Sequence, residues 1–286
     1  MEVVIGVGNT GCAVVDILKN EDGYEVYKIE AKIRGNRTLS FPVLKTIQEY
    51  ETEALEKEEK IEGLFEDVSE EDTVTVIVSG ADVVSGSTLV VLEKLRKKTK
   101  VLDVLYIRPD RSFLTKEKKD NDAFVFGVLQ EFARSGVLEK IYLIDVAQAE
   151  KIMGEVPLAE YEKRLHELIA STMTLVKFYT RTEPILDNRG EPKETSRIAT
   201  FGVSSFENNI LEEVFFDLKS PQEKIYFYGM SKDDLESDGS LLKKIKSHAK
   251  SMEKEDSGHE VSFAVFQTSY EENMVLCLLL TDKVQV

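Results

Sequence analysis

Short runs of consecutive apolar residues alternate with amphipathic stretches through the first half of the chain. Runs that are apolar at nearly every position are typical of parallel strands buried on both faces. The stretches between several of them repeat apolar residues at helical spacing. The pattern therefore predicts a doubly wound α/β domain over residues 1–154, with strands at Glu2–Val7, Tyr24–Ile33, Thr73–Ser79, Val101–Ile107 and Lys140–Val146 and helices at Cys12–Lys19, Thr88–Lys97 and Ala123–Arg134.

The pattern changes after residue 154. Apolar positions at steps of three and four run from Pro157 to Thr180 and predict one helix about 36 Å long, at about 1.5 Å per residue. We place this central helix at residues 155–180, between the first domain and a small α+β C-terminal domain at residues 181–286. In that second domain we predict strands at Arg197–Val203 and Lys224–Tyr228, helices at Asn208–Leu218 and Leu241–Ser251, and an antiparallel hairpin of Glu260–Thr268 and Met274–Thr281 around the turn Ser269–Asn273.

Charge narrows the classes of function. The 286 residues include 53 acidic and 37 basic side chains, which gives a net charge of −16. Such a surface repels nucleic acid and anionic membranes, so we expect neither as a direct partner. Residues 49–72 carry twelve acids against Lys57 and Lys60. This stretch predicts an exposed, partly helical flap whose charges form a solvated face or, alternatively, a rim that attracts cations.

Other residue types exclude further classes of site. Cys12 and Cys277 each lie in an apolar run and are predicted to be buried, reduced thiols. The three histidines are widely spaced, so we expect no histidine-based metal site. No run of apolar residues approaches the roughly 18 that a membrane-spanning helix needs. We therefore expect a soluble, cytoplasmic protein.

A glycine loop follows the first predicted strand. Gly6, Gly8 and Gly11 match the G-x-G-x-x-G pattern, and a helix is predicted to follow directly. Glycines there let the backbone approach a phosphate, whose charge is stabilised at a helix N-terminus. One interpretation is a dinucleotide site, with Glu30 about 20 residues later binding a ribose hydroxyl. A tight strand-to-helix turn without a ligand is the other.

A second loop of this kind follows the strand Thr73–Ser79, and the segment reads TVTVIVSGADVVSGSTLVVL. Two such loops, the long central helix and the small C-terminal domain occur here in the order of the FtsZ/tubulin superfamily, and the whole chain resembles that family in element order. The resemblance implies a Rossmann-like nucleotide-binding domain, a central helix and an α+β activation domain. It also implies head-to-tail self-association into filaments, with a nucleotide between subunits.

The resemblance implies GTP or GDP, with Mg²⁺, bound to the backbone of both loops. The matching positions are Gly8, Asn9, Thr10, Gly11 and Cys12 in the first loop and Gly80, Ser85, Gly86, Ser87 and Thr88 in the second. Arg108 and Arg111 follow the fourth strand, where the family has a loop around the ribose and phosphates, so either is a candidate phosphate ligand. The family's catalytic acids come from the neighbouring subunit, and Asp187 and Glu191 lie in the matching stretch.

Several positions depart from the family pattern. Asp82-Val83-Val84 replaces three glycines of the phosphate loop, and Cys12 replaces an asparagine that contacts guanine. The acids Asp187 and Glu191 have altered spacing, with Arg189 between them. We therefore expect a weakened or lost nucleotide site and at most a slow GTPase. Two alternatives stay open: an NAD(P)-binding Rossmann protein or oxidoreductase that uses the first loop and Glu30, and a structural member of the superfamily that binds no nucleotide.

Overall fold

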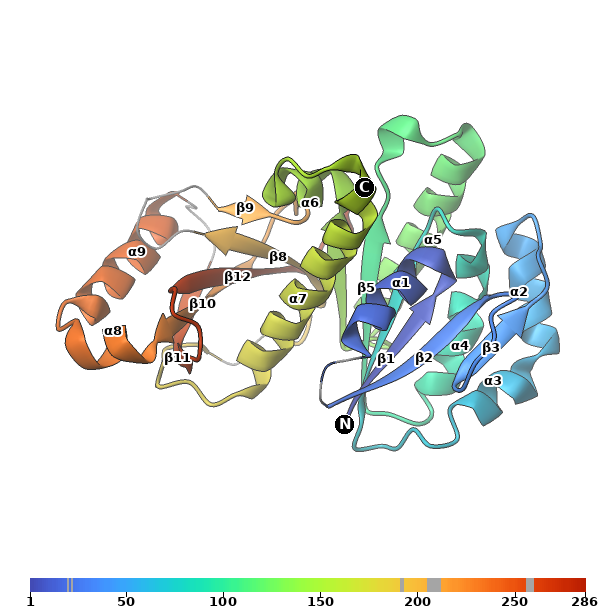
Figure 1. Cartoon of the computed structure of the whole chain (residues 1–286), viewed down its shortest axis with the longest axis horizontal. Helices are drawn as coiled ribbons and strands as arrows, with labels where there is room; N and C mark the ends of the chain where they lie inside the picture. Colours follow the sequence, from blue (N-terminus) through green and yellow to red (C-terminus); the bar gives the residue numbers. More distant parts are fainter. Residues whose placement is uncertain (20, 22, 191–192, 205–211, 256–259) are drawn as a thin grey trace. The chain divides into compact units, whose positions relative to one another are not determined.

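The computed structural model describes residues 1–286 except 20, 22, 191–192, 205–211 and 256–259. The chain divides into two compact units (Figure 1). Unit 1 comprises Met1–Ala170 and Val284–Val286, and unit 2 comprises Ser171–Lys283. The division falls inside helix α7 (Tyr161–Arg181), which belongs in part to each unit. Among the described residues, no helix is long and apolar enough to cross a membrane.

Unit 1 contains a parallel sheet in the order β3-β2-β1-β4-β5-β6. Every strand pair in it is parallel, as predicted from the continuous apolar runs. Strand β4 is buried from its second residue to its last, because helices cover both faces of the sheet. The strands are β1 (Glu2–Val7), β2 (Tyr24–Ala31), β3 (Thr38–Phe41), β4 (Thr73–Ser79), β5 (Val101–Arg108) and β6 (Lys140–Asp145).

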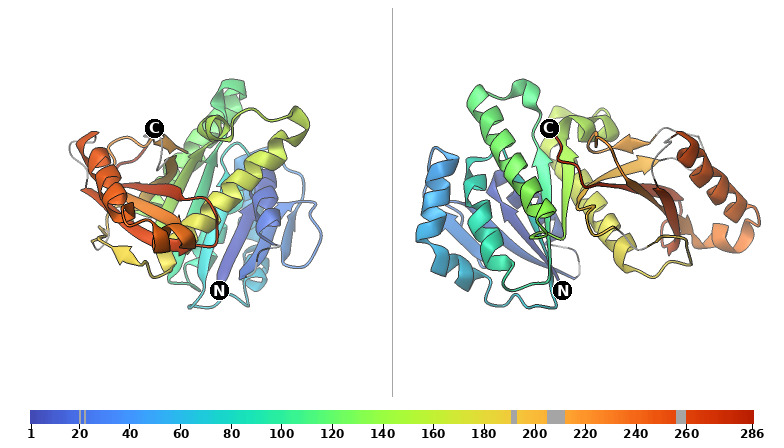
Figure 2. Two further views of the ribbon diagram at one scale, coloured as in Figure 1. Left: turned by 60° about the vertical axis from the view of Figure 1, so that its left-hand side comes forward. Right: turned by 180° about the vertical axis from the view of Figure 1, so that it is seen from behind.

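Helix α1 lies on one face of this sheet, and α4 and α5 lie on the opposite face (Figures 1 and 2). Helix α5 begins seven residues before the predicted start at Ala123, because its first turns are polar and carry no apolar period. The hydroxyl of Thr115 caps this earlier start by accepting from the Lys118 N–H. The helices are α1 (Gly8–Leu18), α2 (Ile47–Glu56), α3 (Glu58–Leu64), α4 (Thr88–Leu95), α5 (Lys116–Arg134) and α6 (Val146–Met153), with 3₁₀ turns η1 (Val83–Ser87), η2 (Arg111–Phe113) and η3 (Leu158–Glu160).

The central helix is continuous, as the apolar period predicts. It begins at Tyr161, since the tight turn η3 takes the three residues before it. Its 21 residues make a rod about 32 Å long, at about 1.5 Å per residue.

Unit 2 contains a mixed sheet in the order β8-β12-β10-β11-β7, and β9 also pairs with β8. Its strands are β7 (Leu186–Asp187), β8 (Ile198–Ser204), β9 (Glu213–Val214), β10 (Glu223–Ser231), β11 (Glu260–Thr268) and β12 (Met274–Thr281), and its helices are α8 (Lys232–Ser237) and α9 (Leu241–Glu255). Two sequence predictions were wrong here. The expected helix Asn208–Leu218 contains β9 instead, and residues 208–211 lie outside the described part.

The predicted hairpin was the second error. Strand β10 lies between β11 and β12, pairing in parallel with β11 and antiparallel with β12. All nine residues of β10 are buried, so both of its edges need hydrogen-bonded partners. The connection after β11 crosses the end of β10, where the Ser231 N–H donates to Asn273 Oδ1 at 3.0 Å. The connection from β11 to β12 is thus a crossover and not a hairpin turn.

Candidate functional site

The two glycine loops meet at the carboxyl edge of the sheet in unit 1. Strands β1 and β4 are parallel neighbours in which Val7 pairs with Val78, so the segments that follow them lie side by side. Helix α1 begins at Gly8, whose φ of +76° is readily adopted only by glycine. Its first turn presents backbone N–H groups and the positive end of the helix dipole at this edge.

The carboxylate of Asp82 occupies that helix end. Its Oδ2 accepts a hydrogen bond from the Asn9 N–H at 2.5 Å, and its Oδ1 accepts from the Val84 N–H at 3.2 Å. The two loops are therefore tied together by one side chain. A Cβ added at Gly8 would lie 2.3 Å from Asp82 Oδ2, which shows how closely the carboxylate approaches the loop backbone. Burial raises the pKa of Asp82, although both hydrogen bonds oppose that shift.

The other first-loop residues have structural contacts. A Cβ on Gly11 would lie 2.3 Å from the Ile77 carbonyl oxygen, so this glycine lets α1 pack directly on β4. The Cys12 thiol is buried and points at the carbonyl oxygens of Gly6 and Ile29, at 3.4 and 3.8 Å. Burial raises its pKa to about 12. Cys12 is a packed thiol, as the sequence predicted, and of these loop residues Asn9 and Thr10 are the more exposed.

The second loop is closed by the start of α2. A Cβ on Gly86 would lie 2.0 Å from the carbonyl oxygen of Ile47, which is the first residue of α2. Ser85, Ser87 and Thr88 are all buried, and the Ser87 hydroxyl donates to the Val84 carbonyl at 2.8 Å. The cavity beside this loop measures about 20 Å³ and is lined by Ile47, Ser85, Thr88 and side chains of α5. A volume of that size holds about one water molecule.

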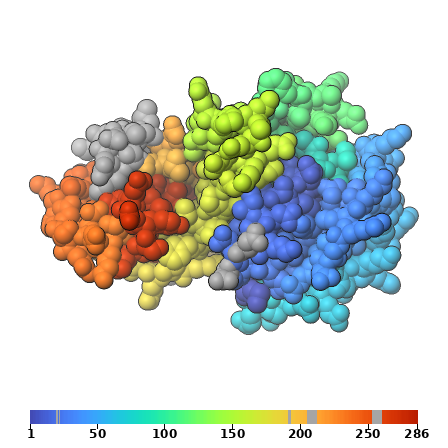
Figure 3. Space-filling model, in the orientation of Figure 1, coloured from blue at the N-terminus to red at the C-terminus, as the bar shows by residue number. Residues whose placement is uncertain are grey.

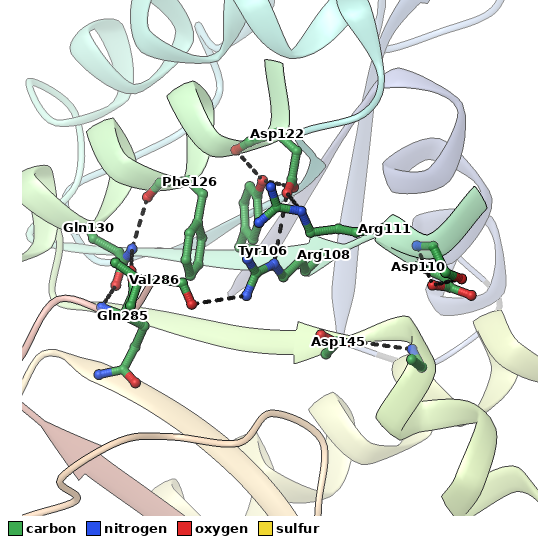
Figure 4. A network of polar contacts seen from close by, with 12 residues as sticks. Tyr106, Arg108, Asp110, Arg111, Asp122, Phe126, Gln130, Asp145, Gln285 and Val286 are labelled. Atoms are coloured by element: carbon green, nitrogen blue, oxygen red, sulfur yellow. Dashed lines mark hydrogen bonds and ion pairs between the residues drawn. The ribbon is translucent and has the colours of Figure 1, made fainter. Parts of the chain in front are cut away.

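A buried acid lies beside the arginines at and after the end of β5 (Figure 4). Asp122, which is fully buried on α5, accepts a hydrogen bond from the Tyr106 hydroxyl at 2.6 Å. The Nε atoms of Arg108 and Arg111 lie 3.8 and 3.7 Å from its other oxygen. Both arginines proposed as phosphate ligands therefore face a carboxylate. The backbone of Gly80 approaches this group closely, because a Cβ at Gly80 would lie 2.1 Å from the Tyr106 hydroxyl.

Sequence reasoning missed Asp122, which lies in the polar run KEKKDND and carries no pattern of its own. Burial raises its pKa, while the Tyr106 hydrogen bond and the charges of Arg108 and Arg111 oppose the shift. The segment Val284–Val286 closes the same region, because Gln130 exchanges two hydrogen bonds with the backbone of Gln285, at 2.6 and 3.1 Å (Figure 4).

The candidate catalytic acids are in unit 2. Asp187, in β7, is held by the guanidinium of Arg189, with Nη2 at 2.6 Å from Oδ2 and Nε at 2.9 Å from Oδ1. This pairing lowers the pKa of Asp187. Glu191 lies outside the described residues. Within the described ranges, no group of three or more His, Cys, Asp or Glu side chains is arranged to hold a metal ion.

Glu30, the candidate ribose ligand of the dinucleotide interpretation, accepts a hydrogen bond from its own strand with one carboxylate oxygen. Its Oε1 accepts from the Ala31 N–H at 2.6 Å, and its Oε2 is buried without a hydrogen-bond partner among the described residues. Burial raises the pKa of Glu30, and the negative charge of Asp82 contributes to the shift. Glu30 and Asp82 thus form a pair of acidic groups beside the first glycine loop.

Comparisons with known proteins identify the fold. No protein-family model and no curated protein match this sequence. Among solved structures, the chain is similar to TubZ of Bacillus thuringiensis in a GTPγS-form protofilament, with a TM-score of 0.74 and 14% identity over 99% of this chain and 87% of TubZ. CetZ2 of Haloferax volcanii in a GTPγS-bound protofilament matches with a TM-score of 0.73 and 15% identity over 98% of this chain and 92% of CetZ2.

An empty FtsZ dimer from M. jannaschii matches with a TM-score of 0.72 and 14% identity over 98% of this chain and 88% of FtsZ. The chain therefore has the FtsZ/tubulin fold, and the resemblance in element order is confirmed at that level.

Proposed function

We propose that this protein is a tubulin-like assembly protein that self-associates head-to-tail into filaments and whose nucleotide site is closed by its own side chains. Similar folds occur in the TubZ and CetZ2 protofilaments, and this likeness supports the assembly half of the proposal. A head-to-tail contact joins two different surfaces, so it extends into an open filament unless the rotation between copies closes a ring.

The position of Asp82 carries the second half. A phosphate that binds at the N-terminus of α1 must displace this carboxylate from the Asn9 N–H or lie beside it. Two like charges about 4 Å apart repel by about 4 kcal/mol at an effective dielectric constant of about 20. That energy corresponds to about a thousandfold loss of affinity. The same argument applies to the pyrophosphate of NAD, so Asp82 disfavours the dinucleotide alternative equally.

Hydrolysis is weakened independently. A carboxylate that positions and polarises an attacking water acts through its negative charge, and the guanidinium of Arg189 is paired with both oxygens of Asp187 and offsets that charge. Asp187 and Glu191 are the acids of this stretch that we propose to support residual turnover. The protein would then be at most a slow GTPase whose assembly does not require the nucleotide.

Calorimetric titration with Mg·GTP, Mg·ATP and NAD tests the closed site. The wild-type chain is expected to bind GTP weakly or not at all. The variant Asp82→Asn should gain GTP affinity, because the amide keeps an acceptor for the N–H groups and loses the charge. Asp217→Asn, which removes an exposed acid of unit 2, is the control with the same change in net charge. Tight GTP binding by the wild type would refute the closed site, and tight binding of NAD alone would establish the alternative.

Sedimentation and electron microscopy over a series of protein concentrations, with and without GTP, test assembly. Filaments are expected in both conditions above the same critical concentration. Filaments that form only with GTP would show that the nucleotide site is functional. A chain that stays monomeric in both would refute self-association.

A further inference from the structure

Unit 1 has a second, much larger cavity at the opposite edge of its sheet. This cleft of about 740 Å³ lies where β5 begins and is lined by residues 96–100, Leu102, residues 135–137 and Glu70. The volume is within the range of about 300–1,000 Å³ that is typical of binding sites. None of its lining residues belongs to the candidate nucleotide site.

The cleft is positive in a chain of net charge −16. Arg96, Lys97, Lys98 and Lys100 line it against the single carboxylate of Glu70. Helices α4 and α5 both end at this cleft, and each helix end contributes about half a negative charge. Those ends account for part of the basic composition, but a surplus of positive charge remains.

Two of these four cations have a hydrogen-bond or ion-pair partner within the chain, and the other two are exposed to solvent. Lys98 donates to the Phe65 carbonyl at 2.8 Å, and Lys100 lies 3.0 Å from Glu70. Arg96 and Lys97 are exposed and form no ion pair with the residues that the structure describes. Their charges face solvent at the mouth of the cleft.

An acidic surface lies directly beside the cleft. Helix α3 packs along α4 through the ion pair of Glu58 with Lys94 at 2.5 Å, and the bond from Lys98 to Phe65 joins the end of α3 to the cleft. The blue segment in Figure 3 that includes α2 and α3 forms an outer surface of unit 1. Glu66 and Asp67 are exposed, follow Phe65 directly and form no ion pair with the residues that the structure describes.

We propose that two copies of this chain pair about a two-fold axis, with Glu66 and Asp67 of each copy at the basic cleft of the other. Adjacent patches of opposite sign make a self-complementary surface, which is what a two-fold contact requires. In this dimer Arg96 and Lys97 of one copy face Glu66 and Asp67 of the other, and the two-fold axis repeats the contact a second time. This contact goes beyond the head-to-tail association, uses a different edge of unit 1 and needs no nucleotide.

Charge reversal tests this pairing. In sedimentation velocity at about 0.1 M salt, where the screening length is about 10 Å, the wild type is expected to dimerise reversibly. Arg96→Glu with Lys97→Glu should weaken the dimer at least tenfold, since each change acts on both sides of the axis. Glu66→Lys with Asp67→Lys should do the same. An equimolar mixture of the two variants should restore a heterodimer, because one then carries two acidic patches and the other two basic ones.

Lys243→Glu with Lys246→Glu is the matched control. These exposed lysines lie on α9 of unit 2, and the net charge changes by the same amount as in the cleft variant. The control should dimerise like the wild type. Equal weakening by the control, or a mixture of the two variants that stays monomeric, would overturn the proposal, and so would a monomeric wild type. Capture of an oligonucleotide at the cleft without pairing would also overturn it.

The outcome is separable from that of the proposed function. Filaments visible by electron microscopy should persist in the cleft variant, because the glycine loops of the candidate nucleotide site lie at the opposite edge of the sheet from the cleft. Dimers without filaments would refute head-to-tail assembly alone. Filaments with no charge-dependent pairing would refute the two-fold contact alone.

Discussion

Gly86 gives the sharpest test of how the second loop is used. An open phosphate loop would tolerate an added methyl group in stability and lose ligand affinity. In this structure the added Cβ of Gly86→Ala would lie 2.0 Å from the Ile47 carbonyl oxygen and 2.9 Å from the Ile47 Cα. Both contacts are with backbone, so the start of α2 must move as a unit.

The cost can be bounded from overpacking data. Inserting a methyl group into a packed interior typically costs about 1–3 kcal/mol. For a domain of about 150–250 residues, each kcal/mol lowers the melting temperature by about 2–4 °C. We therefore expect Gly86→Ala to melt about 2–12 °C below the wild type in thermal unfolding followed by circular dichroism.

An alanine at a second glycine, used as the control, should raise the stability of the protein. Gly127 lies within α5, and a Cβ there meets nothing within 4 Å. Gly127→Ala should stabilise the protein by about 1 kcal/mol, because alanine is the better helix former. If Gly86→Ala melts at or above the wild-type temperature while Gly127→Ala behaves as expected, the second loop is not closed by α2 and the reasoning fails.

Further predictions concern charge, burial and turnover. Burial raises the pKa values of Asp82 and Glu30 above their ordinary 3.8 and 4.5, so the folded state holds these protons more tightly than the unfolded chain. The free energy of unfolding should therefore fall as pH rises from about 4 through the raised pKa values. Urea titrations of Asp82→Asn at several pH values should show a shallower fall. Tyr106→Phe leaves Asp122 without its hydrogen bond and should cost about 1–3 kcal/mol, measured by urea unfolding, whereas Tyr270→Phe, at an exposed position, should cost nothing measurable. Phosphate release from GTP should be slow or absent at every protein concentration, and brisk release independent of concentration would show that one subunit holds a complete site. Added salt should strengthen head-to-tail assembly in light scattering, because it screens the repulsion between chains of net charge −16; weaker scattering in high salt would contradict this.

The sequence by itself determined five strands of unit 1 and its helices α1, α4 and α5, whereas β3 and α6 were not predicted. Strands such as Glu2–Val7 have no polar side chain after the first residue, and only a sheet covered on both faces buries them completely. The apolar period of α7 likewise predicted a single long helix. Glycines at positions 6, 8 and 11 predicted the entry into α1, although the helix begins at Gly8 and not after a turn that ends at Gly11. The carboxylate of Asp82 already indicated a poor environment for phosphate. These features are local, because propensity and periodicity act over a few residues.

Tertiary structure decided which segments meet. Strands β11 and β12 have the pattern of a hairpin, but the fully buried β10 needs partners on both edges and separates them. The sequence indicates that Gly86 is a phosphate-loop glycine, but in the structure the start of α2, 39 positions earlier in the chain, packs against it. Asp82 bonds to Asn9, 73 residues away, and Asp122 acquires its role from Tyr106 and two arginines on another strand end. Each of these outcomes depends on close packing between distant segments, because the free energy of a buried charge or an added methyl group is set by the atoms around it and not by its neighbours in sequence.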